Sequence, residues 1–282
     1  MPMRGKCDAS LMRACQTCGI LVPMIDPSDP MSTFAGLRDR DYKRAGLIVL
    51  EGRIVIEKAL SCGGRVRALL CVPADEDEWR RVSCDTFAVG ALGRAEMENL
   101  VLFAFHRGAL ALADRPPPPV PEDLPAGSAL ALWNVTDPDN LGALIRSASA
   151  LGVSRIYLGP GCADPYGRKS LRASMGCALG LPIVPLSGIG ELPLARGQGG
   201  NLLVAAALAP GAAEPAAVAA LAVSASRAVT LLLGNEGWGL PPDIVAACDE
   251  RVIVPMAGGV DSLNVGAAGA ILMWELFRRH TR

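Results

Sequence analysis

The chain has 282 residues, 51% of them hydrophobic, with 31 glycines, 22 prolines and a formal net charge of −1. This length allows two domains with separate cores, and the near-neutral charge excludes a protein that binds nucleic acid through its overall charge, so any RNA-binding surface must be local. The longest apolar region, residues 201–234, is broken by prolines and charges before it reaches the roughly 18 residues that a transmembrane helix requires.

Nine cysteines are scattered along the chain without the spacing of a disulfide framework. An odd number of scattered thiols is typical of a reducing compartment, so we expect a soluble, cytoplasmic protein with no membrane segment. Cys15 and Cys18 form the only C-x-x-C pair, and no second pair accompanies it. Because a structural zinc site requires four ligands, no metal is predicted. Residues 1–32 are predicted to be a disordered extension.

The proline-rich stretch "DRPPPPVPEDLPAG", residues 114–127, marks a domain boundary. Consecutive prolines lock the backbone in an extended form and lack N–H donors, which gives a semi-rigid spacer. Upstream of it, residues 46–52 and 66–72 are predicted strands and residues 53–62 an amphipathic helix, followed by a strand, a turn and a helix start over 87–103. The pattern predicts a small α/β domain over residues 33–114 and a linker over 115–127.

Basic residues are concentrated in the first half of that domain. Between residues 38 and 67 there are eight lysines and arginines against four acidic residues. Such a concentration is usual on a solvated face, and it also fits a surface that follows the phosphates of a nucleic acid. The basic positions are 38, 40, 43, 44, 53, 58, 65 and 67.

The second half of the chain alternates short apolar runs with segments of helical length. The predicted strands cover residues 129–133, 155–159, 181–186, 201–208, 229–234 and 251–256. Continuous apolar strands separated by helices indicate a parallel sheet that is covered on both faces, so the fold class is α/β. Ligands of such sheets bind beyond the carboxyl ends of the strands. We therefore expect the chemistry of this protein at that edge.

The first stretch whose residues could take part in chemistry is residues 134–153, "NVTDPDNLGALIRSASALGV". Asp139 or Asn140 is predicted to cap a helix whose apolar residues follow helical spacing. Arg146 lies off that apolar stripe. It is either a solvated helix residue or an arginine held over the strand ends, where its fork of donors could bind a phosphate or polarise a hydroxyl.

The second stretch is residues 231–240, "LLLGNEGWGL", in which a buried strand runs into a glycine-rich turn. The three glycines allow a ligand to approach the main chain closely. Neither a phosphate-binding Gly-Lys-Ser/Thr loop nor a G-x-G-x-x-G dinucleotide motif is present. Glu236 at the centre of the turn requires a partner, and Arg146 would serve as one.

The third stretch, residues 251–277, contains a strand, a loop with three polar residues and an apolar helix. Ser262 or Asn264 is predicted to cap that helix, and this capping role alone could account for both residues. Small residues at positions 266–270 would let the helix pack very close to a neighbour, and its apolar surface predicts burial. A dimer interface along this helix is one interpretation.

Together, in this order and at these separations, the three stretches resemble the three motifs of the SpoU/TrmH family of RNA ribose 2′-O-methyltransferases, which belong to the knotted methyltransferase superfamily. The matching residues are Asn140, Gly142 and Arg146 in the first stretch, Gly234, Glu236 and Gly239 in the second, and Pro255, Met256, Ser262, Leu263 and Asn264 in the third. Residues 163–177 resemble the family's intervening segment, and residues 47–60 are similar to the small domain that often precedes the catalytic one.

The resemblance implies a catalytic domain over residues 128–282 with an α/β fold and a parallel sheet. Its C-terminal segment would pass through a loop of the chain and form a deep trefoil knot. It implies that residues 33–114 form an L30e-like α/β domain that binds the RNA substrate. It also implies S-adenosyl-L-methionine as methyl donor and a homodimer in which the arginine of one subunit approaches the cofactor of the other. The residues expected to hold the cofactor are Leu233, Gly234, Val254, Met256 and Leu263.

By the same resemblance, Arg146 would activate the ribose 2′-hydroxyl. A guanidinium resists deprotonation, so orienting and polarising the hydroxyl fits its chemistry better than acting as a general base. Asn140 would position the ribose or Arg146, and Glu236 would hold Arg146 in place. Ser262 and Asn264 would stabilise the loop that closes on the reacting centre.

The predicted function is methyl transfer to a ribose of RNA, with ribosomal RNA favoured over transfer RNA by the two-domain architecture. The alternatives left open are a tRNA 2′-O-methyltransferase, a nucleobase methyltransferase of the same superfamily, and a non-catalytic RNA-binding protein on the same knotted scaffold. A Rossmann-type oxidoreductase is disfavoured because the dinucleotide fingerprint is missing.

Overall fold

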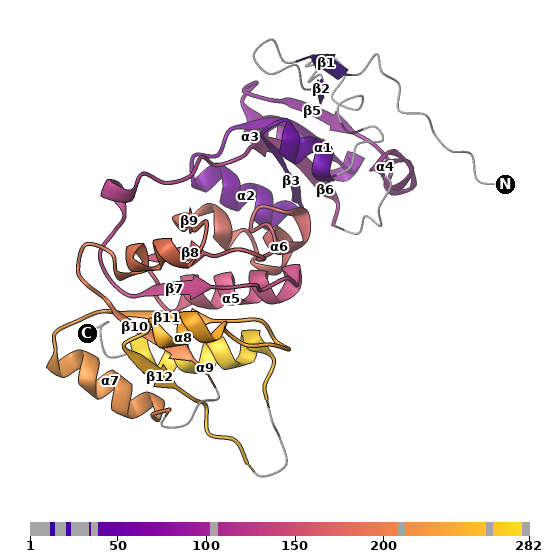
Figure 1. Cartoon of the computed structure of the whole chain (residues 1–282). Helices are drawn as coiled ribbons and strands as arrows, with labels where there is room; N and C mark the ends of the chain where they lie inside the picture. The colour runs from indigo at the N-terminus through magenta and orange to yellow at the C-terminus, as the bar shows by residue number, and fades with distance from the viewer. Residues whose placement is uncertain are drawn as a thin grey trace. The chain divides into compact units, whose positions relative to one another are not determined.

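The computed structural model describes residues 12–14, 21–23, 34, 39–101, 107–207, 212–257 and 262–277. The chain packs as two compact units (Figure 1). The N-terminal unit comprises Met1–Pro116 and Tyr166–Arg172, and the C-terminal unit comprises Pro117–Pro165 and Ala173–Arg282. Two three-residue strands, β1 (Met12–Ala14) and β2 (Leu21–Pro23), pair antiparallel within the extension that was predicted to be disordered. The Cys15–Cys18 pair lies outside the described residues.

The N-terminal unit is built on a four-stranded sheet with the order β3-β6-β4-β5. Its strands are β3 (Leu47–Glu51), β4 (Val66–Cys71), β5 (Ala88–Ala91) and β6 (Ala109–Asp114). Its helices before the linker are α1 (Asp39–Arg44), α2 (Arg53–Ser61), α3 (Glu76–Ser83) and α4 (Arg94–Val101). The strands predicted at 46–52 and 66–72 and the helix predicted at 53–62 are confirmed, whereas β6 and α3 were not predicted.

The predicted alternation of the second half is confirmed by a six-stranded sheet in the C-terminal unit, with the order β12-β10-β11-β7-β8-β9. All five strand pairs are parallel. The strands are β7 (Ala129–Leu132), β8 (Arg155–Leu158), β9 (Ile183–Pro185), β10 (Leu202–Ala206), β11 (Val229–Leu233) and β12 (Glu250–Val252). The last strand is shorter than the predicted 251–256, because Ile253 already donates to Ala213 and Pro255 has no N–H for a ladder.

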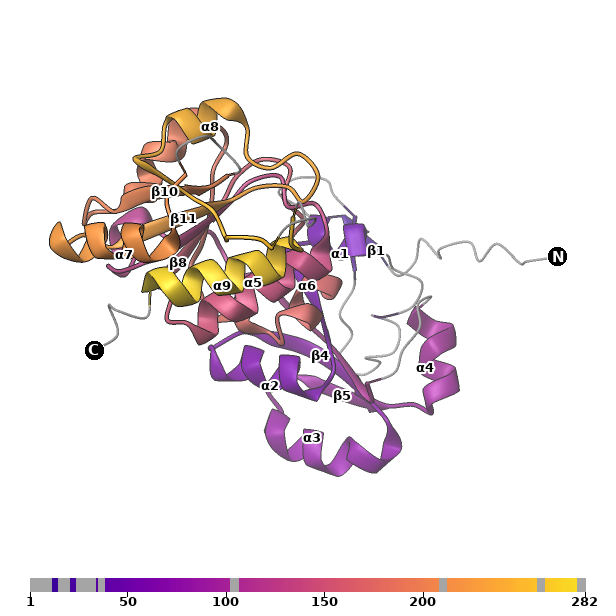
Figure 2. The same cartoon turned by 90° about the horizontal axis from the view of Figure 1, so that it is seen from below.

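Helices cover both faces of this sheet. Helices α5 (Pro138–Ala150) and α9 (Val265–Phe277) pack together on one side, and α8 (Pro242–Ala246) lies on the other (Figure 2). Helix α7 (Pro215–Ser224) contacts α9, and the 3-10 helix η6 (Ile189–Arg196) contacts α8. The unit's remaining short elements are η4 (Pro121–Asp123) and η5 (Cys177–Leu179), and α6 (Arg168–Ala173) begins in the N-terminal unit. The parallel α/β fold class is therefore confirmed.

The small residues of α9 serve packing within the unit. A Cβ on Gly269 would lie 2.3 Å from Cδ2 of Leu144 in α5 and 2.8 Å from Cδ1 of Leu233 in β11. Leu144 and Leu233 are almost fully buried. Since interiors are packed to crystal-like density, only glycine fits at this crossing. The close approach predicted from positions 266–270 is therefore confirmed here, with α5 and the sheet as the neighbours.

A buried arginine fixes the end of the proline-rich linker to the sheet. Arg155 in β8 is 2% exposed, and its Nη1 donates to the carbonyls of Pro125 (2.6 Å) and Gly127 (3.2 Å). Its Nε donates to the Tyr157 hydroxyl at 2.8 Å. Carbonyl groups next to a buried cation are stabilised by charge-assisted hydrogen bonds, and they lose that stabilisation if the cation is removed.

No helix of the described residues is long and apolar enough to cross a bilayer.

We expect Arg155→Met to lower the free energy of unfolding by about 2 kcal/mol, because the hydrogen bonds from its guanidinium to the Pro125 carbonyl and to the buried Tyr157 hydroxyl would be lost. The matched control is Arg146→Met, which replaces an exposed arginine of the same unit. Its expected effect is within about 0.5 kcal/mol. Urea unfolding followed by circular dichroism measures both variants, and equal midpoints would contradict the assigned role of Arg155.

Candidate active site

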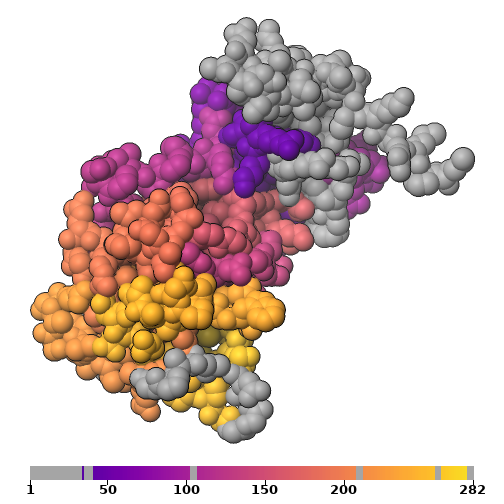
Figure 3. Space-filling view, viewed as in Figure 1, coloured from indigo at the N-terminus to yellow at the C-terminus, as the bar shows by residue number. Residues whose placement is uncertain are grey.

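A cavity of about 650 Å³ lies where β10, β11 and β12 end. Its wall is drawn from segments 206–207, 233–240, 242–246, 251–256 and 262–272. These segments, coloured orange to yellow, lie together in the space-filling view (Figure 3). The position agrees with the expectation that ligands of a parallel sheet bind beyond the carboxyl ends of its strands.

The residues predicted to hold a cofactor all belong to this wall. Leu233 ends β11 and Gly234 follows it, Val254 and Met256 follow β12, and Leu263 precedes α9. Glu236 and Ser262 line the same cavity and are exposed. The wall is formed largely by aliphatic side chains and by the main chain of glycine-rich loops, a lining suited to a partly apolar ligand.

A chain of side-chain hydrogen bonds joins the three stretches singled out in the sequence. Asn140 Nδ2 donates to Glu236 Oε1 at 2.6 Å, and Asn264 Nδ2 donates to Asn140 Oδ1 at 2.8 Å. Asn264 Oδ1 in turn accepts from the backbone N–H groups of Gly266 (2.9 Å) and Ala267 (3.3 Å). Asn264 is therefore the cap of α9 and at the same time a member of the polar chain. The predicted capping role of Asn264 is confirmed, whereas its role in a loop that closes on the reacting centre stays a prediction.

Helix α5 starts two or three residues earlier than the predicted cap would place it. Asp137 is its N-cap: Oδ1 of Asp137 accepts from the backbone N–H of Asp139 at 2.7 Å and of Asn140 at 3.0 Å. The prediction that Asp139 or Asn140 caps this helix is wrong. The sequence did contain the signal, because Pro138 follows Asp137 and proline is favoured at the first helical position. With its backbone N–H held by Asp137, the side chain of Asn140 remains available for Glu236 and Asn264.

Arg146 lies on α5 and is exposed. The expected ion pair between Arg146 and Glu236 is not found among the described residues, since Glu236 accepts from Asn140 instead. The structure thus brings Asn140, Glu236 and Asn264 together, places Ser262 on the cavity wall, and leaves the guanidinium of Arg146 exposed on its helix.

The turn that carries Glu236 is held by hydrogen bonds at both ends. Asn235 and Gly239 exchange two backbone hydrogen bonds of 3.1 and 2.9 Å. Asn235 Nδ2 donates to the carbonyl of Asn134 at 3.0 Å, and Asn235 Oδ1 accepts from the N–H groups of Gly237 and Trp238. Sequence analysis did not single out Asn235. An asparagine within a glycine-rich turn was the available signal, because its side chain commonly bonds the backbone two residues on.

Cys162 lies beside the first stretch and is held as a structural thiol. Its Sγ donates to the carbonyl of Leu132 and accepts from the N–H of Val135, each at 3.4 Å. Burial raises the pKa of the Cys162 thiol to about 11. A thiol with such a pKa is protonated at neutral pH, so this cysteine is unsuited to act as a nucleophile.

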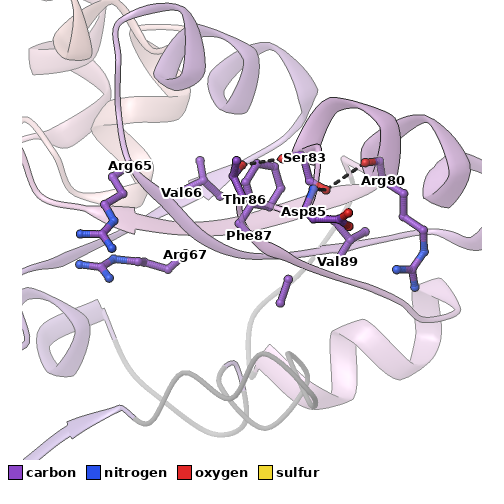
Figure 4. A pocket seen from close by; sticks show the side chains of 10 residues that line it. Arg65, Val66, Arg67, Arg80, Ser83, Asp85, Thr86, Phe87 and Val89 are labelled. Atoms are coloured by element: carbon purple, nitrogen blue, oxygen red, sulfur yellow. Dashed lines mark hydrogen bonds between the residues drawn. The ribbon is translucent and has the colours of Figure 1, made fainter.

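A second hollow, of about 530 Å³, lies in the N-terminal unit at the start of β4 and β5 (Figure 4). Arg65, Arg67 and Arg80 line it, together with Asp85. Arg67 forms a two-point ion pair with Asp114 at 2.7 and 2.8 Å, and Arg80 pairs with Glu76. Most of the positive charge in this hollow is therefore neutralised.

The same holds for Arg53, another member of the predicted basic surface. Arg53 donates to Glu78 at 2.6 Å and lies over the ring of Trp79. The bond to Glu78 raises the pKa of the Arg53 guanidinium. As in the hollow of Figure 4, the arginine is already paired with an acidic side chain. The positive charge available to a nucleic acid in this part of the unit is therefore smaller than the count of basic residues in the sequence suggests.

The sequence of the C-terminal unit matches a known protein family. The model of the SpoU rRNA methylase family matches residues 127–274. An uncharacterised tRNA/rRNA methyltransferase of Mycobacterium tuberculosis is 34% identical over 266 residues, covering 90% of each chain. The chain belongs to the SpoU rRNA methylase family.

Two further similarities bear on the chemistry. The 23S rRNA (guanosine(2553)-2′-O)-methyltransferase RlmP of Bacillus subtilis is 27% identical over 245 residues, covering 84% of this chain and 91% of the relative. The AdoMet-bound rRNA methyltransferase from Sinorhizobium meliloti superimposes with a TM-score of 0.74 at 26% identity, covering 87% of this chain and 92% of that one. The protein is thus an RNA methyltransferase of the SpoU family.

We expect Gly234→Ala to destabilise the protein, because a Cβ there would lie 2.3 Å from the carbonyl carbon and oxygen of Gly239 and 2.4 Å from the nitrogen of Leu240. Backbone atoms cannot rotate away, so a loss of about 2 kcal/mol and a fall in Tm of about 6 °C are expected. The control is Gly237→Ala in the same turn, where the nearest atom to a Cβ is Asn235 Oδ1 at 3.4 Å. Thermal denaturation compares the two, and equal Tm values would show that the turn does not require the close approach.

Proposed function

We propose that this protein transfers a methyl group from S-adenosyl-L-methionine to a ribose 2′-hydroxyl of ribosomal RNA. The observation that carries the proposal is the hydrogen-bonded chain Glu236–Asn140–Asn264 beside the 650 Å³ cavity. It joins, at one edge of the sheet, the residues that match the family's three motifs. The relative RlmP, named as a 2′-O-methyltransferase of 23S rRNA, supports the ribose oxygen as the acceptor.

The cavity fits the proposed donor. Its volume lies within the roughly 300–1,000 Å³ typical of small-molecule sites. Leu233, Gly234, Val254, Met256 and Leu263 would hold the adenosyl and methionyl parts, with main-chain groups at the glycine-rich turn available to the adenine edge. When bound, S-adenosylmethionine supplies an electrophilic methyl group on a sulfonium. A solved neighbour described as AdoMet-bound supports the same donor.

The protein's own contribution would be positioning and polarisation. Arg146 would contact the ribose 2′-hydroxyl or an adjacent phosphate, where a fixed positive charge stabilises the oxygen as it loses its proton. A guanidinium retains its own proton at neutral pH, so the hydroxyl proton would leave to a substrate phosphate or to water. Ser262, exposed at the cavity wall, would add a hydroxyl donor near the reacting centre.

Glu236 and Asn264 would fix the amide of Asn140, and with it the start of α5, rather than holding Arg146 directly. This assignment changes the role first expected for Glu236. The Glu236 carboxylate makes a short charge-assisted bond to the Asn140 amide, and bonds of this kind give more rigidity than neutral ones. Asn140 would then present a defined edge to the ribose.

The remaining expectations from the family resemblance stay predictions. They are a trefoil knot formed by the chain that follows β12, an L30e-like RNA-binding domain over residues 33–114, a homodimer, and a cytoplasmic location. The chain between β12 and Ser262 includes residues 258–261, which lie outside the described residues. A homodimer would matter for catalysis if Arg146 of one protomer served the cavity of its partner.

Arg146→Ala is expected to lower methyl transfer by at least about a hundredfold, the typical cost of removing one donor that stabilises developing charge. Because Arg146 does not line the cavity, the affinity for S-adenosylmethionine measured by calorimetry should remain within about twofold. Transfer of a radiolabelled methyl group to RNA measures the rate. Arg146→Lys keeps the charge and loses the fork of donors, so it should restore only a small part. A rate equal to wild type in Arg146→Ala would contradict the role of this residue.

Deleting the gene from its source cells should remove a 2′-O-methyl group from ribosomal RNA. A methylated ribose cannot attack its own phosphodiester, so it resists alkaline cleavage, and the sites of resistance can be mapped across total RNA. The purified protein should restore the missing mark to RNA from the deleted cells. Loss of a mark only in transfer RNA would favour the tRNA alternative. No lost mark, together with no binding of S-adenosylmethionine in calorimetry, would favour a non-catalytic RNA-binding protein.

A further inference from the structure

We propose that Trp238 forms a stacking site for one unpaired base of the RNA substrate, beside the cavity. This residue is 89% exposed, more than any other large hydrophobic residue in the described part of the chain. It belongs to the cavity wall, two residues after Glu236. The inference rests on the proposed function, because it assigns a base-binding element to the same active site.

The backbone that carries Trp238 is held rigidly. The side chain of Asn235 accepts a hydrogen bond from the N–H of Trp238 at 3.2 Å and from that of Gly237 at 2.8 Å. Both backbone bonds between Asn235 and Gly239 close the turn around it. An aromatic side chain with two rotatable bonds on a fixed turn loses little conformational entropy when a ligand stacks on it. Such a ring is therefore prepared for binding before the RNA arrives.

The surroundings of Trp238 favour a base over a protein surface. Its neighbours in the turn are Glu236, Gly237 and Gly239, all exposed and none of them apolar in side chain. The core of a protein–protein interface is a continuous apolar patch, whereas an exposed aromatic ring whose neighbours in the turn carry no apolar side chain is suited to stack on a nucleobase. The polar edge of a base could bond the turn while its face contacts the indole.

The charge beside Trp238 also disfavours the RNA backbone as the group that contacts it. Glu236 is exposed, and its carboxylate would repel a phosphate placed against the indole. A neutral base has no such penalty. RNA that is recognised with sequence preference is mostly single-stranded, with splayed bases that stack on aromatic side chains. Trp238 would thus hold a base close to the nucleotide whose ribose is methylated.

The test compares Trp238→Ala, Trp238→Phe and wild type on ribosomal RNA from cells that lack the gene. A stacked base contributes about 1–3 kcal/mol, which corresponds to a loss of RNA affinity of about fivefold to 150-fold in Trp238→Ala. The KM for RNA should rise by the same factor, and Trp238→Phe should recover most of it. Leu221→Ala, at an exposed apolar residue of α7 outside the cavity, is the control and should change neither value.

Filter binding measures RNA affinity without turnover, calorimetry measures S-adenosylmethionine affinity, and sedimentation measures the oligomeric state. Unchanged S-adenosylmethionine affinity and oligomeric state, with weakened RNA binding in Trp238→Ala alone, support the stacking site. Equal RNA affinity of Trp238→Ala and wild type would overturn it. A changed oligomeric state would also overturn it, by showing that a second copy of the chain covers Trp238. Failure of the wild-type protein to methylate or bind any RNA would instead overturn the proposed function.

Discussion

The site depends on the side-chain amide of Asn140, which hydrogen-bonds two partners at once. Asn140 donates to Glu236 and accepts from Asn264, so a single residue at the start of α5 connects the turn after β11 to the start of α9. An asparagine is suited to this position because its side chain has both a donor and an acceptor at the same end. Aspartate would place a carboxylate against Glu236, and leucine would leave both partners without a bond. The three loops are joined because this one residue can satisfy both neighbours.

Glycines make that arrangement possible by removing side-chain volume where chain segments cross. Gly234 has the backbone of Gly239 where its Cβ would be, and Gly269 has two leucine side chains there. The first contact closes the turn that presents Glu236, and the second sets α9 close to α5 and β11. The distances of 2.6 and 2.8 Å along the polar chain require this close packing. Packing and polar contacts therefore constrain each other at the edge of the sheet.

The parallel sheet was predictable because its strands are short, apolar and regularly separated by helical segments. The members of the polar chain were also found, because residues 140, 236 and 264 belong to the three stretches that resemble the family's motifs. Their pairing was not, because a contact across 96 or 124 residues leaves no local pattern. Strand β6 was missed for a related reason: its alanines and leucines favour helix, and only pairing with β3 and β4 makes it a strand. The cap at Asp137 was missed although its signal is local.

The partner of Glu236 has a consequence for how positive charge is used at this site. If Arg146 were paired with Glu236, its donors would be directed at a carboxylate, and an anionic substrate would have to compete for them. The neutral amide of Asn140 donates to the Glu236 carboxylate instead, and Arg146 is left exposed. In the N-terminal unit the opposite holds, since Arg53 and Arg67 are already bound to acidic side chains. On the proposed function, the guanidinium that has to meet a ribose phosphate is thus one that the described fold does not use for its own stability.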